Sequence, residues 1–242
     1  MERFVYEQMA ELDERHWWYC ARRDVIAALI RRTVRPPSGA AILEIGCGTG
    51  HNFKMLGEFG RVDALELDDE ARAIAEKRLR RTIMSAPLPA LAGVPERHYD
   101  LVGAFDVIEH IDDDAASIAS IGRLLKPGGK FVMTVPAHQW MWSAHDTVNH
   151  HKRRYSRRTL TALIEGSPLK LDRVGYFNSL LFPVAVAERL ASKAMGKDGG
   201  DLELPPAPLN TALKRTFAAE RHLVGRIPLP PGLSLFAVAS AT

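Results

Sequence analysis

The sequence predicts an α/β fold in which a mostly parallel β-sheet is covered by helices on both faces. Short apolar runs alternate with helix-like segments between residues 40 and 136, as in repeated strand–helix units. The first apolar run ends in a glycine cluster at 46–50, as a strand does when it enters a tight turn before a helix. The 242 residues are 46% hydrophobic and 25% charged, which is typical of globular chains and excludes a disordered or collagen-like one.

Each element is justified by its local pattern. Apolar positions at helical spacing predict a helix over 22–32, which the following Pro-Pro-Ser-Gly segment ends. The alternating region then gives strands at 41–45, 61–66, 82–84, 99–105 and 130–135, with helices at 52–59, 70–81 and 113–125. The remaining chain gives a helix at 159–165, a strand at 171–176, a partly apolar helical stretch at 177–223 and a last strand at 233–239.

Charge and cysteine content narrow the class of protein. The 32 Lys and Arg residues against 29 Asp and Glu leave a net charge of +3, which does not require a nucleic-acid partner. Cys20 and Cys47 are too few for a disulfide framework or a four-thiolate zinc site. The N-terminus lacks the apolar core of a secretory signal, and no apolar run approaches the roughly 18 residues of a membrane span. We therefore expect a cytoplasmic protein.

The glycine cluster indicates what kind of ligand binds. Gly46, Gly48 and Gly50 have the spacing G-x-G-x-G, whereas the dinucleotide fingerprint would place a glycine where His51 stands. The Gly-Lys-Ser/Thr of a P-loop is also missing, so a pyrophosphate is not expected. Glu66 ends the second strand, where a carboxylate can accept hydrogen bonds from two ribose hydroxyls. The alternative is an ordinary strand–helix turn followed by a solvated strand end.

Four segments in this order resemble the motifs of class I S-adenosylmethionine-dependent methyltransferases. They are I-L-E-I-G-C-G-T-G at 42–50, the strand ending in Glu66, Y-D-L-V-G-A-F-D-V-I-E-H at 99–110, and L-L-K-P-G-G-K-F-V-M-T-V at 124–135. The chain is most similar to the small-molecule type, that is type 11 and the ubiquinone and menaquinone methyltransferases. The resemblance implies a Rossmann-like seven-stranded sheet in the order 3-2-1-4-5-7-6, whose last strand, 233–239, is antiparallel.

The resemblance also implies the cofactor, S-adenosylmethionine, and its product, S-adenosylhomocysteine. The glycines would pass under the methionine and ribose, and Glu44 would lie near the amino group. Glu66 would hold the ribose, and Asp106 with Val107 would flank the methionine end. An N-terminal lid would cover the cofactor. In many relatives an acidic residue binds adenine, and here a serine and an alanine stand in its place. The cofactor-binding residues are then Trp17, Tyr19, Arg22, Glu44, Gly46, Cys47, Gly48, Gly50, Glu66, Leu67, Ser85, Ala86, Phe105, Asp106, Val107 and His110.

Methyl transfer is an in-line displacement that depends chiefly on positioning, and a general base is needed only for a protonated acceptor. His110 is one candidate base, and the loop after the fifth strand supplies two further catalytic candidates, His145 and Asp146. These two could instead pair with Arg154 and Tyr155 to fix the loop, or they could face the acceptor directly. The loop spacing is not that of an H-E-x-x-H helix, so we expect no metal. The candidate substrate-binding residues are Trp140, Trp142, His151, Arg154 and Tyr155.

We therefore expect one methyltransferase domain, 1–242, with a helical lid at 1–36 and substrate-side insertions at 137–158 and 177–228. The expected function is methyl transfer to a small, hydrophobic or lipid-like acceptor. The alternative is a related protein that binds the cofactor for another reaction or as a binding module. The N-P-P-Y tetrapeptide of nucleic-acid methyltransferases is absent, which argues against a nucleic-acid substrate. The apolar stretch at 177–195 fits an acceptor pocket first, a homodimer contact second and a peripheral membrane contact third.

Overall fold

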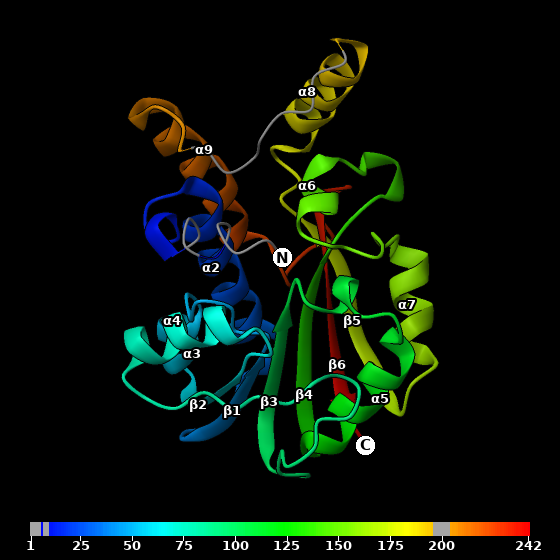
Figure 1. Ribbon diagram of the computed structural model, residues 1–242. Coiled ribbons are helices and arrows are strands. Elements are labelled where there is room, and N and C mark those ends of the chain that lie inside the picture. The colour runs from blue at the N-terminus through cyan, green and yellow to red at the C-terminus, as the bar shows by residue number, and fades with distance from the viewer. Residues whose placement is uncertain (1–5, 7–9, 196–203) are drawn as a thin grey trace.

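The computed structural model describes residues 6, 10–195 and 204–242. At its centre is a six-stranded sheet in the order β2-β1-β3-β4-β6-β5 (Figure 1). Strands β2, β1, β3 and β4 pair in parallel, whereas β6 is antiparallel to both of its neighbours. The strands are β1 (Ala40–Ile45), β2 (Gly60–Leu65), β3 (Tyr99–Phe105), β4 (Leu125–Pro136), β5 (Leu169–Phe177) and β6 (Ser234–Ala241).

The predicted α/β class and the antiparallel last strand are confirmed, but the sheet has six strands instead of seven. The predicted third strand, 82–84, forms only a single parallel bridge between Met84 and Leu65. The Met84 amide donates to the Ala64 carbonyl at 3.1 Å, and the Met84 carbonyl accepts from the Glu66 amide at 3.0 Å. Pro87 follows soon after and has no amide hydrogen, so the pairing cannot extend along this edge.

Helices cover the sheet on both faces (Figure 1). One face carries α2 (Trp17–Leu29), α3 (Phe53–Gly57) and α9 (Ala207–Ala219), and the other carries α5 (Asp114–Leu124) and α7 (Arg157–Glu165). The expected helix at 22–32 begins earlier, at Trp17, because the His16 side chain caps it by accepting from the Trp18 amide. The other helices are α4 (Asp69–Leu79), α6 (Ala144–Val148) and α8 (Phe182–Met195).

Strand β1 shows how the two apolar layers are supplied. All six of its residues are buried, as expected for a parallel strand covered on both sides. Ile42 belongs to the apolar cluster that includes Val25 of α2, whereas Leu43 belongs to the cluster that includes Ile118 of α5. Successive side chains point to opposite faces of the sheet, so one strand serves both layers.

The carboxyl ends of the parallel strands lie together at one edge, from which α6, α8 and α9 project (Figure 1). The C-terminus lies at the opposite edge because β6 runs in the reverse direction. The predicted lid at 1–36 and the predicted insertion at 177–228 both include residues outside the described ranges. Within those ranges, no helix combines the length and apolar character needed to cross a bilayer.

Candidate functional site

A cavity of about 930 Å³ opens at the carboxyl ends of the parallel strands. Its walls come from the N-terminal helix, the glycine loop, the ends of β2 and β3, the loop after β4, and α8. Fifteen of the residues predicted from the sequence line it: Trp17, Tyr19, Arg22, Gly46, Gly48, Glu66, Leu67, Ala86, Phe105, Asp106, Val107, His110, His145, His151 and Arg154.

The three glycines of the loop after β1 all have positive φ, and each has a different surrounding. A Cβ on Gly46 would lie 2.6 Å from a methyl group of Val107, so that position needs glycine for close packing. A Cβ on Gly50 would meet Leu79 of α4 at 3.0 Å, and Gly50 does not line the cavity. A Cβ on Gly48 would meet nothing within 4 Å, so only Gly48 presents open backbone to the cavity.

Glu66 joins the glycine loop to the start of α4. Its Oε2 accepts from the Gly48 amide at 2.7 Å, and its Oε1 accepts from the Asp68 amide at 2.9 Å. Burial raises the pKa of Glu66, and these two hydrogen bonds act in the opposite direction. A carboxylate oxygen can accept more than one hydrogen bond, so Glu66 can still bind a ligand hydroxyl from the cavity.

Glu44 and Cys47 do not line the cavity. The Asn52 side chain donates to Glu44 Oε1 at 2.8 Å, whereas Glu44 Oε2 is buried without a hydrogen-bond partner among the described residues. Burial raises the pKa of Glu44 to about 8. Cys47 is buried and packs with Ala64 and Ala75. The Cys47 side chain therefore belongs to the apolar core between β2 and α4.

The N-terminal helix reaches the cavity through a buried arginine. Arg22 Nη2 lies 2.6 Å from Asp106 Oδ2 and 2.9 Å from the Thr134 hydroxyl, which itself donates to Asp106 Oδ1 at 3.1 Å. The guanidinium also lies 4.9 Å from the ring centroid of Trp18 and 5.9 Å from that of Phe105. Asp106 has a φ of +58°, a strained value for a residue other than glycine.

Asp146 connects several residues of the loop after β4 by hydrogen bonds. It is fully buried, and its carboxylate accepts from the Ser143 amide at 2.9 Å as part of the capping box of α6. Arg154 donates to both carboxylate oxygens, at 2.7 and 2.8 Å, and His151 Nδ1 lies 2.9 Å from Oδ1. These contacts hold the pKa of Asp146 well below its usual range. The predicted pairing of Asp146 with Arg154 is confirmed, and these contacts hold Asp146 within the loop.

Four other predicted residues do not line the cavity. Tyr155 was expected to pair with Asp146, which is wrong, because its buried hydroxyl donates to Asp114 at 2.7 Å. Trp140 is 52% exposed and lies against Phe182, with 6.4 Å between the ring centroids. Trp142 and Ser85 also lie outside the lining, and of the predicted adenine pair only Ala86 reaches it.

Two side chains of the cavity were missed as functional residues. Glu109 precedes His110 and is fully buried, and burial raises its pKa well above the ordinary value. His51 stands where a dinucleotide fold has glycine, and burial lowers its pKa well below the ordinary value. Burial, together with the nearby His151, also lowers the pKa of His110, to about 4. Glu109 lies within the segment 99–110, which resembles a methyltransferase motif, and this resemblance is the sequence feature that could have identified Glu109 as a functional residue.

Helix α8 contributes a wall of the cavity, although it lies far along the chain from the glycine loop. Leu181 and, within α8, Val184, Ala185, Glu188 and Arg189 line the cavity. The hydrophobic members of this group face the same space as the histidines of the loop after β4. The apolar stretch at 177–195 therefore contributes a wall to the cavity, as the acceptor-pocket hypothesis requires.

Comparison with protein families agrees with this architecture. The family described as "Methyltransferase domain" matches residues 17–173, which is more than half of the chain. The chain belongs to the class I S-adenosylmethionine-dependent methyltransferases. Within this family, the match includes the glycine loop, Glu66, the D-V-I-E-H segment and the histidine-rich segment after β4 (137–156, the histidine loop), and it ends before α8.

Individual relatives support the same family. A protein of Mycolicibacterium smegmatis, named "probable S-adenosylmethionine-dependent methyltransferase", is 29% identical over 69% of this chain and 65% of its own length. A ubiquinone biosynthesis O-methyltransferase of Nitrosospira multiformis is 27% identical over 49% of this chain and 47% of its own. The chain thus matches less than two thirds of the length of either relative. A chain from the complex of the Haloferax volcanii Trm112 methyltransferase activator with a methyltransferase has the same fold, with a TM-score of 0.63 at 18% identity, over 98% of this chain and 94% of its own.

The cavity of this methyltransferase-family protein has groups that fit the family's cofactor. Gly48 offers open backbone, and Glu66 offers a carboxylate beside it. Glu44 has a buried oxygen without a partner in the described structure, which suits the ammonium group of the cofactor's methionine part. The polar groups of S-adenosylmethionine therefore have chemically matching residues at this end of the cavity.

Proposed function

We propose that the protein transfers the methyl group of S-adenosylmethionine to a small, apolar acceptor that carries a hydroxyl group. One observation carries the proposal: a single cavity joins the polar glycine loop and Glu66 to the apolar side chains of α8. Both reactants would therefore occupy one continuous space. The O-methyltransferase name of the Nitrosospira multiformis relative supports oxygen as the accepting atom.

In this proposal the cofactor occupies the end of the cavity formed by β1 and β2. Glu66, with Leu67, binds the ribose hydroxyls, and the backbone from Gly46 to Gly48 passes beneath the ligand. The ammonium group lies toward Glu44. Ala86 adjoins the adenine, and Asp106 with Val107 flanks the methionine part. The cofactor's sulfonium supplies an activated methyl group, so the protein needs chiefly to align the two reactants.

The acceptor occupies the space between the histidine loop and α8. Holding its oxygen about 3 Å from the methyl carbon, in line with the bond to sulfur, provides most of the rate enhancement. His110 and His145 both line this part of the cavity and are the groups placed to assist loss of the hydroxyl proton. Asp146 acts through Arg154 and His151, which it holds in place.

The proposal includes a cytoplasmic location and a small-molecule partner. The buried free thiols of Cys20 and Cys47 are in keeping with a reducing compartment. A homodimer contact or a peripheral membrane contact would compete for the apolar residues that α8 leaves exposed, such as Leu190. Sedimentation of the purified protein and flotation with anionic vesicles test these two partners separately.

The decisive experiment uses methyl-labelled S-adenosylmethionine with a panel of apolar phenols and alcohols, and it follows label in the extracted product. Val184→Asp places a charge on the acceptor wall and should raise KM for the acceptor about tenfold, with cofactor affinity unchanged. Leu190→Asp is the matched control, because Leu190 is similarly exposed on the same helix but does not line the cavity. Equal effects of the two variants would contradict the acceptor pocket. Tight cofactor binding without any methylated product would favour a non-methylating role.

A further inference from the structure

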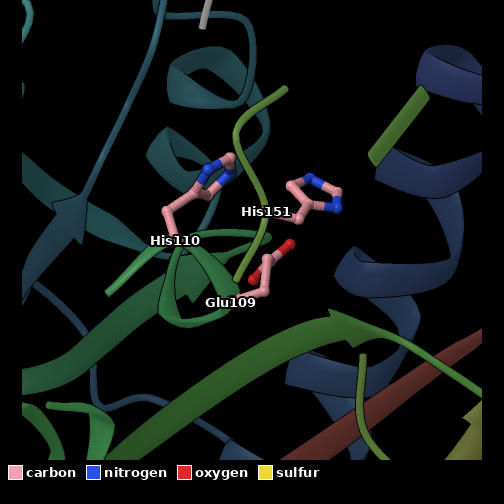
Figure 2. Close-up of side chains that lie close together, drawn as sticks. All are labelled: Glu109, His110 and His151. Atoms are coloured by element: carbon pink, nitrogen blue, oxygen red, sulfur yellow. The ribbon is translucent and has the colours of Figure 1, made fainter. Parts of the chain in front are cut away.

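Glu109, His110 and His151 bring a carboxylate and two imidazoles together on one wall of the cavity (Figure 2). One possible ligand atom of each residue lies within 4.8 Å of those of the other two. Glu109 and His110 follow β3, whereas His151 comes from the loop after α6, about forty positions later in the sequence. The fold, and not a local sequence motif, creates this cluster.

Glu109 lacks the partners that other buried carboxylates have. It is fully buried, and neither of its oxygens accepts a hydrogen bond from another described residue. By contrast, the buried Glu220 accepts from three backbone amides, and Asp146 accepts from Ser143, Arg154 and His151. Burying a carboxylate without such partners is costly, so the arrangement calls for a bound cation or donor at Glu109.

His151 is oriented in the way that proteins orient metal-binding histidines. Its Nδ1 lies 2.9 Å from Asp146 Oδ1, and Arg154 Nε donates to the same oxygen at 2.7 Å. This leaves Nε2 as the nitrogen available to an ion. A carboxylate that holds the far nitrogen of a ligating imidazole fixes both its tautomer and its ring orientation.

The other members of the cluster are held by the backbone. The His110 imidazole hydrogen-bonds to the Asn149 backbone, and its ring centroid lies 4.7 Å from that of His151 at an interplanar angle of 83°. The Lys152 amide donates to the Glu109 carbonyl at 2.8 Å, which ties the histidine loop to the segment after β3. The three side chains therefore start from positions fixed relative to one another.

We propose that Glu109, His110 and His151 bind a divalent transition-metal ion that coordinates the acceptor oxygen. The inference rests on the proposed function and specifies the acceptor as a hydroxyl compound. It departs from the sequence-based expectation of no metal. Two imidazoles and one carboxylate suit zinc, iron, cobalt or manganese better than magnesium or calcium, which prefer oxygen ligands. With metal–ligand bonds of about 2.1 Å, the donor atoms of a tetrahedral site lie roughly 3.4 Å apart. The donor atoms here lie within 4.8 Å of one another, so side-chain rotations that move each donor by about 1 Å would complete the site.

Such an ion would change how the acceptor is activated. Coordination lowers the pKa of a hydroxyl group, so its proton passes to water at neutral pH. The oxygen lone pair then forms the bond to the methyl carbon, the carbon–sulfur bond breaks, and its electron pair stays on sulfur. S-adenosylhomocysteine and the methyl ether are the products. His110 then serves as a ligand, and no histidine base is needed.

The test titrates the full-length, chelator-treated protein with Zn²⁺ by calorimetry and with Co²⁺ by visible absorption, without cofactor or acceptor. We expect one ion per chain and a ligand-field spectrum for Co²⁺. Glu109→Gln and His151→Asn should each weaken binding at least 100-fold, since loss of an outer partner alone costs about 10- to 100-fold. His150→Asn is the matched control, because it removes the adjacent, exposed histidine of the same loop.

Binding of less than one ion per chain, or equal binding by the Glu109→Gln variant, would overturn the inference. Glu109→Gln keeps the side-chain shape, so it remains informative if His151→Asn does not fold. Cofactor affinity, measured separately, should be unchanged in both variants. Stoichiometric metal binding without methylated product would support the ion while contradicting the proposed function. Full methyl transfer by the chelator-treated protein would support the function while contradicting the ion.

Discussion

Arg22 of α2 and Asp106, the residue after β3, form an ion pair of 2.6 Å at the floor of the cavity. The Arg22 side chain is only 3% exposed. It links the N-terminal helix to the carboxyl edge of the sheet, and its guanidinium also lies over the ring of Trp18. Helix α2 and the strand end that flanks the proposed methionine site are therefore joined through this side chain.

We expect Arg22→Ala to destabilise the protein by about 3–5 kcal/mol, because it leaves Asp106 partly buried without its cation. Urea unfolding measures this change. Arg31→Ala is the control, since Arg31 pairs with Glu58 while both side chains are more than half exposed. That variant should lose about 1 kcal/mol or less. Similar losses of unfolding free energy in both variants would show that the buried Arg22–Asp106 pair stabilises the protein no more than an exposed ion pair does.

Glu66→Ala should weaken S-adenosylmethionine binding about 10- to 150-fold, because it removes a charge-assisted hydrogen bond worth about 1.5–3 kcal/mol. It also releases the Gly48 amide, which Glu66 holds at 2.7 Å. Isothermal calorimetry gives the affinity, and circular dichroism confirms that the variant folds. Glu165→Ala, an exposed change at the end of α7, should bind normally. Unchanged affinity in a folded Glu66→Ala protein would remove the carboxylate from the proposed cofactor site.

Cofactor binding should release a proton from Glu44. Burial raises the pKa of Glu44 to about 8, so the free protein holds this carboxyl mostly protonated at pH 7. The cofactor's ammonium group would favour the carboxylate and lower that pKa. Binding then releases up to about one proton, and affinity rises with pH until about pH 8. Calorimetry at pH 7 in buffers of different ionisation enthalpy detects the proton, and Glu44→Gln should abolish the difference between buffers.

Glu220→Ala should loosen the junction between β5 and α8. The Glu220 carboxylate accepts from the Asn178, Ser179 and Leu180 amides at 2.6 to 2.8 Å, and it is fully buried. Its removal leaves buried donors unpaired and should cost about 3 kcal/mol. Hydrogen exchange should quicken at 178–180, and KM for the acceptor should rise more than that for the cofactor. Glu220→Gln, which keeps one acceptor oxygen, should recover part of the loss.

Local patterns predicted most of the fold because each strand between 40 and 136 carries its own apolar run. The strand predicted at 82–84 is reduced to a single bridge at the edge of the sheet. Its residues favour a strand, but only Met84 pairs with β2 before the prolines begin. The start of α2 was placed too late, since the cap comes from His16, ahead of the apolar positions.

The roles of individual site residues were harder to predict than the fold, because the burial of each side chain depends on contacts between segments that are distant in the sequence. Gly46, Gly48 and Gly50 looked equivalent in sequence, yet only Gly48 leaves open backbone over the cavity. Asp146 looked catalytic beside three histidines, but the capping box of α6 and Arg154 occupy its carboxylate. Glu109 became prominent only when its burial and its distance to the histidine loop were known.

The hydrogen bond between the Trp17 amide and the Asn210 side chain connects two helices from opposite ends of the chain. Trp17 belongs to α2, which faces the proposed cofactor site, whereas α9 contributes Leu213 to the lining of the same cavity. A ligand that restrains α2 therefore also reduces the conformational freedom of α9. Cofactor and acceptor should then bind with positive cooperativity. Thermodynamic linkage makes this coupling reciprocal, so each ligand tightens the other by the same factor.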